Sequence, residues 1–97
     1  MLFLVISKPV PTPPSQARPN RKKLWEWAEP LMHQGVIKDR TMYAKVGRGA
    51  VALFNVESIE ELHRLLSHWI ELIPAEFEIH PLMDQSTTAA YLSEDIQ

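Results

Sequence analysis

The stretch that decides the fold reads AVALFNVESIEELHRLL, residues 50–66. Its first seven residues are apolar apart from Asn55, which is typical of a strand buried on both faces. Ser58 and Glu61 then have the spacing of a capping box, in which the two side chains bind free amides at the start of a helix. Apolar residues recur at helical spacing as far as Ile73, and Pro74 ends the pattern. The stretch therefore predicts a buried strand followed directly by an amphipathic helix.

Three further strands are predicted outward from this stretch. Residues 2–6, LFLVI, form a second uniformly apolar run, and residues 36–46 are mixed in charge and polarity, which suits an exposed edge strand. Residues 76–80, EFEIH, alternate between polar and apolar, which indicates a strand with unlike faces. A Gly-Arg-Gly turn at 47–49 separates the second strand from the third.

A second helix is predicted between the first two strands. Four prolines in residues 8–14 indicate an extended connector, because proline fixes φ and removes a donor. We expect the helix to begin at Pro19, run for about 15 residues and end near Gly35. Its apolar face contains Leu24, Ala28 and Leu31. Pro30 is expected to kink this helix or to break one of its hydrogen bonds.

The predicted order is strand, helix, strand, strand, helix, strand, which is the ferredoxin-like arrangement of the α+β class. Residues 1–97 form one such domain, a four-stranded antiparallel sheet with two helices on one face, and residues 84–97 form a polar C-terminal tail. The two apolar runs are the central strands of that topology. Because the helices cover one face only, the other apolar face predicts a homodimer that buries sheet against sheet.

Composition excludes several classes of protein. Ten Lys and Arg against twelve Asp and Glu give a net charge of −2, which argues against a nucleic-acid-binding surface. Cysteine is absent, so disulfides, thiolate metal sites and cysteine nucleophiles are excluded. No apolar run approaches the roughly 20 residues of a membrane helix, and the apolar start lacks the basic flank of a signal peptide. We expect a cytoplasmic protein without a membrane partner.

A resemblance to a known family rests on a collinear set of short motifs. FNVES at 54–58, followed by ELH at 61–63 and LL at 65–66, is similar to the F-D-V-x-S…L-H-x-x-L segment of muconolactone isomerases. The opening MLFLV and the FEI and PL of 77–82 are similar too. The resemblance implies a ferredoxin-like fold that pairs as a dimeric α+β barrel and can form larger rings. It also implies proton transfer within an unsaturated lactone during aromatic breakdown, without a metal or organic cofactor.

The sequence departs from this family where the isomerase keeps its site. The family's helix glutamate, implicated in proton transfer, corresponds to Leu24 when residues are counted back from Gly35 without gaps. The tryptophan- and arginine-rich second strand of the family is replaced by residues 37–43, and its tyrosine–asparagine pair by residues 48–51. The scaffold is therefore matched better than the isomerase site.

Five residues are the candidates for chemistry. His63 and Tyr43 are the candidate acid–base groups, and His63 stands where the family also has histidine. Arg40 and Arg48 are candidates for holding a carboxylate, and Trp25 for walling a pocket. Each has a plainer interpretation, since His63 suits packing and Tyr43 and Arg40 suit the surface. Tyr43 and Arg40 also face opposite sides of an unbroken strand, so at most one enters a given pocket.

Other ionisable residues give weaker indications. None of the four histidines is four residues from another, so no helical metal pair is present, and neither a metal site nor an organic cofactor is predicted. Residues 18–23 hold four basic side chains near a helix start, which suggests a partner surface or a ligand carboxylate. Glu76, Glu78 and His80 share one strand face, where they line a pocket or protect an edge.

Two classes of function are compatible with these residues. The first is an isomerase-like protein that binds a small acidic, unsaturated or cyclic metabolite and transfers a proton within it. The alternatives are a non-catalytic ligand-binding or assembly protein on the same scaffold, or a cofactor-free oxygenase or cyclase-like enzyme of the barrel superfamily. Leucine at position 24 favours the non-catalytic alternative over a strict isomerase.

Overall fold

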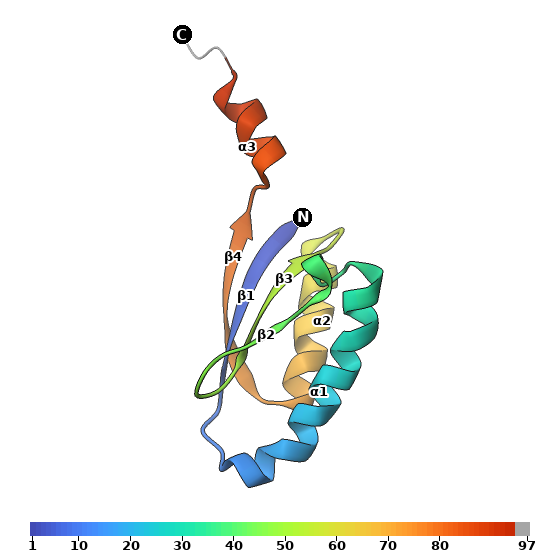
Figure 1. Ribbon diagram of the computed structural model, residues 1–97, viewed down its shortest axis with the longest axis vertical. Coiled ribbons are helices and arrows are strands. Elements are labelled where there is room, and N and C mark those ends of the chain that lie inside the picture. Colours follow the sequence, from blue (N-terminus) through green and yellow to red (C-terminus); the bar gives the residue numbers. More distant parts are fainter. Residues whose placement is uncertain (95–97) are drawn as a thin grey trace.

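The computed structural model describes residues 1–94 of the 97. Strands and helices follow one another in the predicted order, with one additional helix after the last strand (Figure 1). The elements are β1 Leu2–Pro9, α1 Pro14–Gln34, the 3₁₀ turn Lys38–Arg40, β2 Tyr43–Ala44, β3 Ala50–Asn55, α2 Ile59–Leu72, β4 Ala75–Leu82 and α3 Gln85–Leu92.

The four strands form one antiparallel sheet in the order β2-β3-β1-β4, which is the ferredoxin-like α+β topology. The two uniformly apolar runs of the sequence are its central strands, as predicted. Helices α1 and α2 lie side by side on one face of the sheet (Figure 1). In register, Val5 pairs with Ala52 on one side and Ile79 on the other, and its side chain is fully buried beneath the helices.

The core lies between this face and the two helices. Phe54, Ile37 and Val5 are fully buried, and Trp69 of α2 is 1% exposed. Trp69 packs edge-on against Phe77 of β4, with 5.2 Å between ring centroids. Aromatic pairs at this separation add stability beyond the area that they bury. Trp27 is half-buried at the edge of this core and stacks on the imidazole of His68.

The predicted capping box forms at the start of α2, with one change. Ser58 Oγ accepts a hydrogen bond from the backbone amide of Glu61 at 3.1 Å. Glu61 Oε2 accepts one from the amide of Glu57 at 2.8 Å, one residue earlier than the usual reciprocal bond. Two free donors at the helix start are thus satisfied, which fixes where α2 begins.

The first helix is longer than predicted. It begins at Pro14, inside the proline-rich segment, because a proline at the first helical position loses no hydrogen bond. Pro19 and Pro30 therefore lie inside α1, and the helix continues through both. Both are exposed, so water can reach the carbonyls that lose a partner. Gly35, in the left-handed conformation at φ 80°, ends the helix as predicted.

The predicted edge strand over residues 36–46 is wrong in extent. Only Tyr43 and Ala44 pair with β3, whereas residues 38–40 form a 3₁₀ turn in which Asp39 and Arg40 have positive φ. Ile37 instead makes an isolated bridge to Phe54, and its side chain is fully buried in the core. The path of this segment is therefore set by the burial of Ile37 rather than by continuous hydrogen bonding to β3.

The sheet face that carries no helix remains open in the monomer. On β1 and β3 the residues that alternate with the buried ones are only partly covered: Leu2, Leu4, Ile6, Val51 and Leu53. On β4 the same face carries Glu76, Glu78 and His80, which pair with Lys8, Ile6 and Leu4.

The C-terminal residues form an arm rather than a featureless tail. After Leu82 the chain runs on past the end of the sheet, and α3 projects beyond the N-terminus of β1 (Figure 1). No residue of α3 is buried, and the molecule measures 58 Å along its longest axis against 25 and 23 Å across. We call residues 83–94 the C-terminal arm.

Candidate functional site

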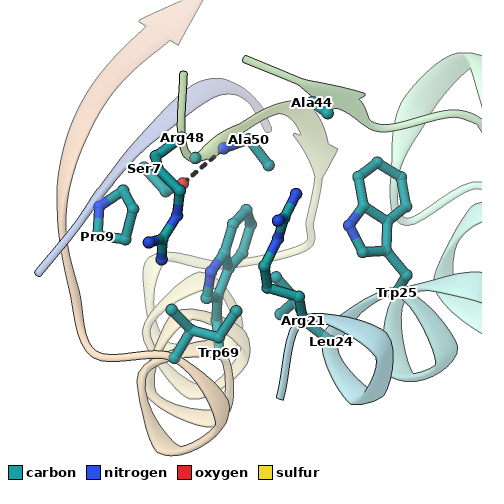
Figure 2. A pocket seen from close by; sticks show the side chains of 11 residues that line it. Ser7, Pro9, Arg21, Leu24, Trp25, Ala44, Arg48, Ala50 and Trp69 are labelled. Atoms are coloured by element: carbon teal, nitrogen blue, oxygen red, sulfur yellow. Dashed lines mark hydrogen bonds between the residues drawn. The ribbon is translucent and has the colours of Figure 1, made fainter. Parts of the chain in front are cut away.

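A cavity opens between α1, the inner face of the sheet and the end of α2. Its volume is about 30 Å³, room for one or two water molecules. It is lined by Ser7, Pro9, Arg21, Leu24, Trp25, Ala44, Arg48, Gly49, Ala50, Trp69 and Ile73. Figure 2 shows the side chains of Arg48 and Arg21 on either side of Trp69, with Trp25 beyond Arg21.

The wall formed by β1 and the turn before β3 is built around Ser7. This serine is the only buried polar residue of the described chain, at 2% exposure. Its Oγ accepts a hydrogen bond from the amide of Ala50 at 2.8 Å, which ties β3 to β1 where the ladder between them ends. A hydroxyl that accepts in this way still has its own proton to donate. Ser7 can therefore offer a hydrogen bond to a molecule in the cavity.

Gly49 lets the turn approach β1 closely. Its φ is +102°, and a Cβ at this position would lie 2.5 Å from the carbonyl oxygen of Ser7. Only glycine fits such a contact. The turn is held from outside by Arg48, whose Nη1 donates to the carbonyl of Thr12 at 2.7 Å. This contact places the Arg48 guanidinium at the cavity with one of its donors already used.

The cavity is positively charged. Arg21 and Arg48 contribute two guanidinium groups, and none of the eleven lining residues is acidic. Within residues 1–94, neither arginine forms a salt bridge with a carboxylate. Both indole rings at the cavity, Trp25 and Trp69, add flat apolar surface. Arginine forks with planar aromatic walls suit a flat ligand that carries a carboxylate or a similar oxyanion.

The structure brings two of the five candidate residues together. Trp25 and Arg48 both line the cavity. Tyr43 does not, because its neighbour Ala44 faces the cavity and successive side chains of a strand point to opposite sides. Arg40 is exposed in the 3₁₀ turn, where it has φ +57°. Neither Tyr43 nor Arg40 therefore lies where it could contact a molecule in the cavity.

His63 lines a different hollow. It faces an apolar groove between α2 and β4, which we call the α2/β4 groove, with Ile59, Ile70, Phe77 and Ile79 around it. The volume of this groove is about 290 Å³. His63 and Arg48 therefore lie on two separate surfaces: His63 on the apolar α2/β4 groove and Arg48 on the cationic cavity.

Sequence reasoning singled out no individual role for Arg21, Ser7 and Trp69. Arg21 belongs to the basic cluster whose place near a helix start suggested a ligand carboxylate. Ser7 follows Phe3 and Val5 at every second residue of the strand, so it faces inward as they do. A polar residue at an inward-facing position is a feature by which the sequence could have indicated Ser7. Trp69 lies in the apolar pattern of residues 59–73, which indicates core packing, and it does occupy the core.

Leu24, at the place of the family glutamate, also lines the cavity and is 4% exposed. An apolar side chain there cannot transfer a proton. Among the described residues that line the cavity, no carboxylate or imidazole is present, and Ser7 is the single hydroxyl. The cavity can bind an anion but lacks an ordinary general base.

A second group of ionisable residues lies on the open face of the sheet. His80 Nε2 is 2.8 Å from Glu78 Oε2, and Lys8 Nζ is 3.7 Å from Glu78 Oε1. The hydrogen bond from His80, followed by the charge of Lys8, lowers the pKa of the Glu78 carboxyl. All three side chains are about half exposed, so this is a solvated cluster on an edge strand.

Comparison with family models matches residues 1–96 to a domain of unknown function, DUF3303. The chain belongs to the DUF3303 family. The comparison with curated proteins finds no match. The family identified is thus DUF3303, and the muconolactone isomerase family is not confirmed for this chain.

Among solved structures, the DUF3303 chain is similar to 5-chloro-2-hydroxyhydroquinone dehydrochlorinase (TftG) from Burkholderia phenoliruptrix AC1100, in complex with 2,5-dihydroxybenzoquinone. The TM-score is 0.64 at 21% sequence identity, and the match covers 90% of this chain and 98% of that chain. At this identity the likeness establishes the ferredoxin-like α+β fold that the sequence predicted.

The described residues include neither a membrane-spanning helix nor a cluster of metal-ligating side chains. None of the helices in residues 1–94 is both long and apolar enough to cross a membrane. Within the same residues, no three histidine, aspartate or glutamate side chains come together as metal ligands would.

Proposed function

We propose that this protein binds a small, planar, acidic metabolite, unsaturated or cyclic, in the cavity between α1 and the sheet. The observation that carries the proposal is that Arg21 and Arg48 line one cavity together with two indole rings, and that no carboxylate lines it. A charge-assisted hydrogen bond from arginine to an oxyanion contributes roughly 1.5–3 kcal/mol. The two arginines of the cavity select for a negatively charged ligand, and its two indole rings select for a planar one.

The ligand of the similar structure fits this description. 2,5-Dihydroxybenzoquinone is a flat ring whose acidic hydroxyls ionise to give delocalised oxyanions. TftG is named for its action on a chlorinated hydroxyhydroquinone and binds that quinone in its complex. Because the two chains share a fold at low identity, the quinone serves here as a probe of the cavity's chemistry rather than as a named substrate.

Binding a ring requires the cavity to open. Its present volume, about 30 Å³, holds water but no ring. Arg21 is exposed on α1 and has room to rotate outward, whereas Arg48 is half-buried and would have to give up its hydrogen bond to the Thr12 carbonyl to do so. Trp69 is held in the core by Phe54 and Phe77, and it remains as the fixed wall. The arginines would thus close over the ring and meet its oxygens.

We favour binding over lactone isomerisation because of Leu24. Moving a proton between two carbons needs a base at the acidic carbon. The two candidate acid–base residues, His63 and Tyr43, line the α2/β4 groove and the open sheet face respectively. Proton transfer in the cavity would have to rely on Ser7, whose hydroxyl has no neighbouring base among the residues that line the cavity.

We further propose that the protein works as a homodimer through the open sheet face. Leu4, Ile6, Val51 and Leu53 form a partly covered apolar surface across the two central strands, and surfaces of that kind usually pair. Leu4→Asp would place a carboxylate in that contact. We expect light scattering to show a dimer for the parent chain and a folded monomer for the variant. A dimer of unchanged strength in the variant would contradict pairing by this face.

The ligand proposal is tested by tryptophan fluorescence. Because Trp25 and Trp69 line the cavity, 2,5-dihydroxybenzoquinone should quench the emission saturably. We expect Arg48→Gln and Arg21→Gln each to weaken binding by about 10–100-fold, the equivalent of one lost charge-assisted hydrogen bond. Arg18→Gln is the matched control, since it removes the same charge from α1 at a residue that does not line the cavity.

Three outcomes separate the alternatives. Saturable quenching that both cavity variants weaken and the control does not supports the proposal. An equal loss of quinone affinity in all three variants would show only non-specific attraction between the anion and the positively charged residues. Quenching without saturation in the parent chain would show that the cavity does not open for a planar anion, and the proposal would fail.

A further inference from the structure

Within residues 1–94, the C-terminal arm, residues 83–94, buries no side chain against its own protomer. α3 buries none of its residues, and Met83, Tyr91 and Leu92 expose 62%, 53% and 72% of their surface. An eight-residue helix is far below the roughly 12–15 residues at which an isolated helix becomes marginally stable in water. The arm therefore needs a surface to pack against.

Helix α3 carries no charged side chain. Its eight residues, QSTTAAYL, are four uncharged polar and four apolar residues. Thr88, Tyr91 and Leu92 lie within about 100° of one another on the helix surface, so the two large apolar side chains share one face. Small residues, chiefly Ala89 and Ala90, allow close approach of the helix backbone to whatever it contacts.

The α2/β4 groove is a surface of matching character. Ile59, Ile70 and Ile79 line it and remain 54%, 41% and 43% exposed, although each is a large apolar residue. Apart from His63, every side chain that lines it is uncharged. The groove runs along α2 from Ile59 to Ile70, a length of about 17 Å, and α3 is about 12 Å long.

The arm is directed away from the groove of its own chain. The backbone is extended at Asp84, with ψ 173°, and the Asp84 side chain accepts a hydrogen bond from the amide of Thr87 at 2.7 Å. α3 therefore starts beyond the end of β4 and continues outward (Figure 1). The groove, in contrast, is lined by Phe77 and Ile79, which lie in the middle of that strand. Returning to it would require the chain to reverse direction at residues 83–84.

We propose that the C-terminal arm of one protomer docks in the α2/β4 groove of a second copy of this chain. Tyr91 and Leu92 enter the groove beside Ile70 and Ile79, and a two-fold exchange covers both arms and both grooves at once. This contact lies on the helix side of β4, so it is separate from sheet-face pairing and from the ligand cavity. His63, which lines this groove, would then contact the arm of the second copy.

The absence of cysteine makes a direct test available. Ser67→Cys marks the groove and Ala89→Cys marks the arm, in two chains that carry tags of different size. After mixing and equilibration, a short bis-maleimide should join the two chains into one heterodimeric product. Glu29→Cys on the exposed side of α1 replaces the groove residue in the control mixture, which should give little of that product.

A charge on the docking face should prevent the contact. We expect Tyr91→Asp, added to the arm chain, to lower the cross-linking yield at least about tenfold, because an unpaired carboxylate is costly in an apolar groove. Ser86→Asp adds the same charge on the opposite face of α3 and should leave the yield nearly unchanged. Circular dichroism of each variant checks that the domain is folded.

The proposal fails on any of three results. No heterodimeric product from the groove and arm chains would show that the arm does not reach a second copy. Product of equal yield with the α1 control would show random collision. Cross-linking only within one chain that carries both cysteines would show that the arm folds back on its own protomer. Quinone binding is measured separately. A negative cross-linking result therefore leaves the ligand proposal intact, and a negative quenching result leaves the docking proposal intact.

Discussion

Replacing Gly49 with alanine should destabilise the fold more than any other glycine substitution in the turn before β3. Gly49 has φ +102°, and an added Cβ would lie 2.5 Å from the Ser7 carbonyl oxygen and 3.2 Å from Pro9 Cδ. The Ser7 oxygen cannot easily give way. Ser7 pairs with Phe77 in the β1–β4 ladder, and its carbonyl also accepts a hydrogen bond from Lys45 Nζ at 3.1 Å.

The magnitude follows from two contributions. A side chain at this positive φ costs about 1–3 kcal/mol in backbone strain. Moving the turn away from β1 also breaks the bond from the Ala50 amide to the buried Ser7 hydroxyl, which costs about 1–3 kcal/mol because both groups are left unpaired. Together these predict a loss of about 2–6 kcal/mol in the free energy of unfolding for Gly49→Ala.

Gly47→Ala provides the matched control. Gly47 lies two residues earlier in the same turn at φ +99°, but an added Cβ there meets nothing within 4 Å. It should lose only the strain, about 1–3 kcal/mol. Urea unfolding followed by circular dichroism measures both variants. If the two losses agree within about 0.5 kcal/mol, the contact with Ser7 carries no energy and the account of this wall is wrong.

Four further outcomes are expected. Ser58→Ala should lower the free energy of unfolding by about 1 kcal/mol through loss of the α2 cap, and an unchanged urea midpoint would contradict the capping box. Trp69→Ala should cost about 3–5 kcal/mol, measured in the same way, because it empties the centre of the core. The Thr87 amide lowers the pKa of Asp84, so the α3 cap is complete above the ordinary carboxyl pKa and is lost as pH falls through the lowered one; NMR of that amide should follow this titration. Muconolactone turnover should stay below roughly 1 s⁻¹ in a standard assay, because Leu24 cannot act as a base.

The central strands and the second helix were predictable because local signals and tertiary packing agree there. Residues 50–56 are apolar on both faces in the sequence, and the capping box at Ser58 marks the helix start independently of the core. Residues 36–46 lacked such agreement. A fully buried Ile37 and a 3₁₀ turn with positive φ at Asp39 and Arg40 depend on contacts with β3 that periodicity does not encode.

The site was predictable only in part, for a related reason. Arg48 and Trp25 drew attention through residue type, yet nothing in their spacing shows that they meet. The cavity depends on segments that are distant in the chain: β1 at Ser7, α1 from Arg21 to Trp25, β2 at Ala44, the turn at Gly49 and the end of α2 at Trp69. Tyr43 was a reasonable candidate by chemistry, but the one-residue alternation that brings Ala44 to the cavity turns Tyr43 to the other face.

The basic residues of α1 connect the cavity to the stability of the fold. The first turn of α1, residues 14–17, has no acidic residue, and Arg18, Arg21, Lys22 and Lys23 follow it, so the first half of the helix carries four positive charges. Arg21 and Arg48 line a cavity without a lining carboxylate, so an anion bound there would meet two guanidinium groups that form no salt bridge within residues 1–94. A ligand that binds only the folded state must raise its stability, by about 2.7 kcal/mol at a hundred times the dissociation constant. Because Arg21 and Arg48 line one cavity only in the folded chain, the free energy of unfolding becomes a measure of how far that cavity is occupied.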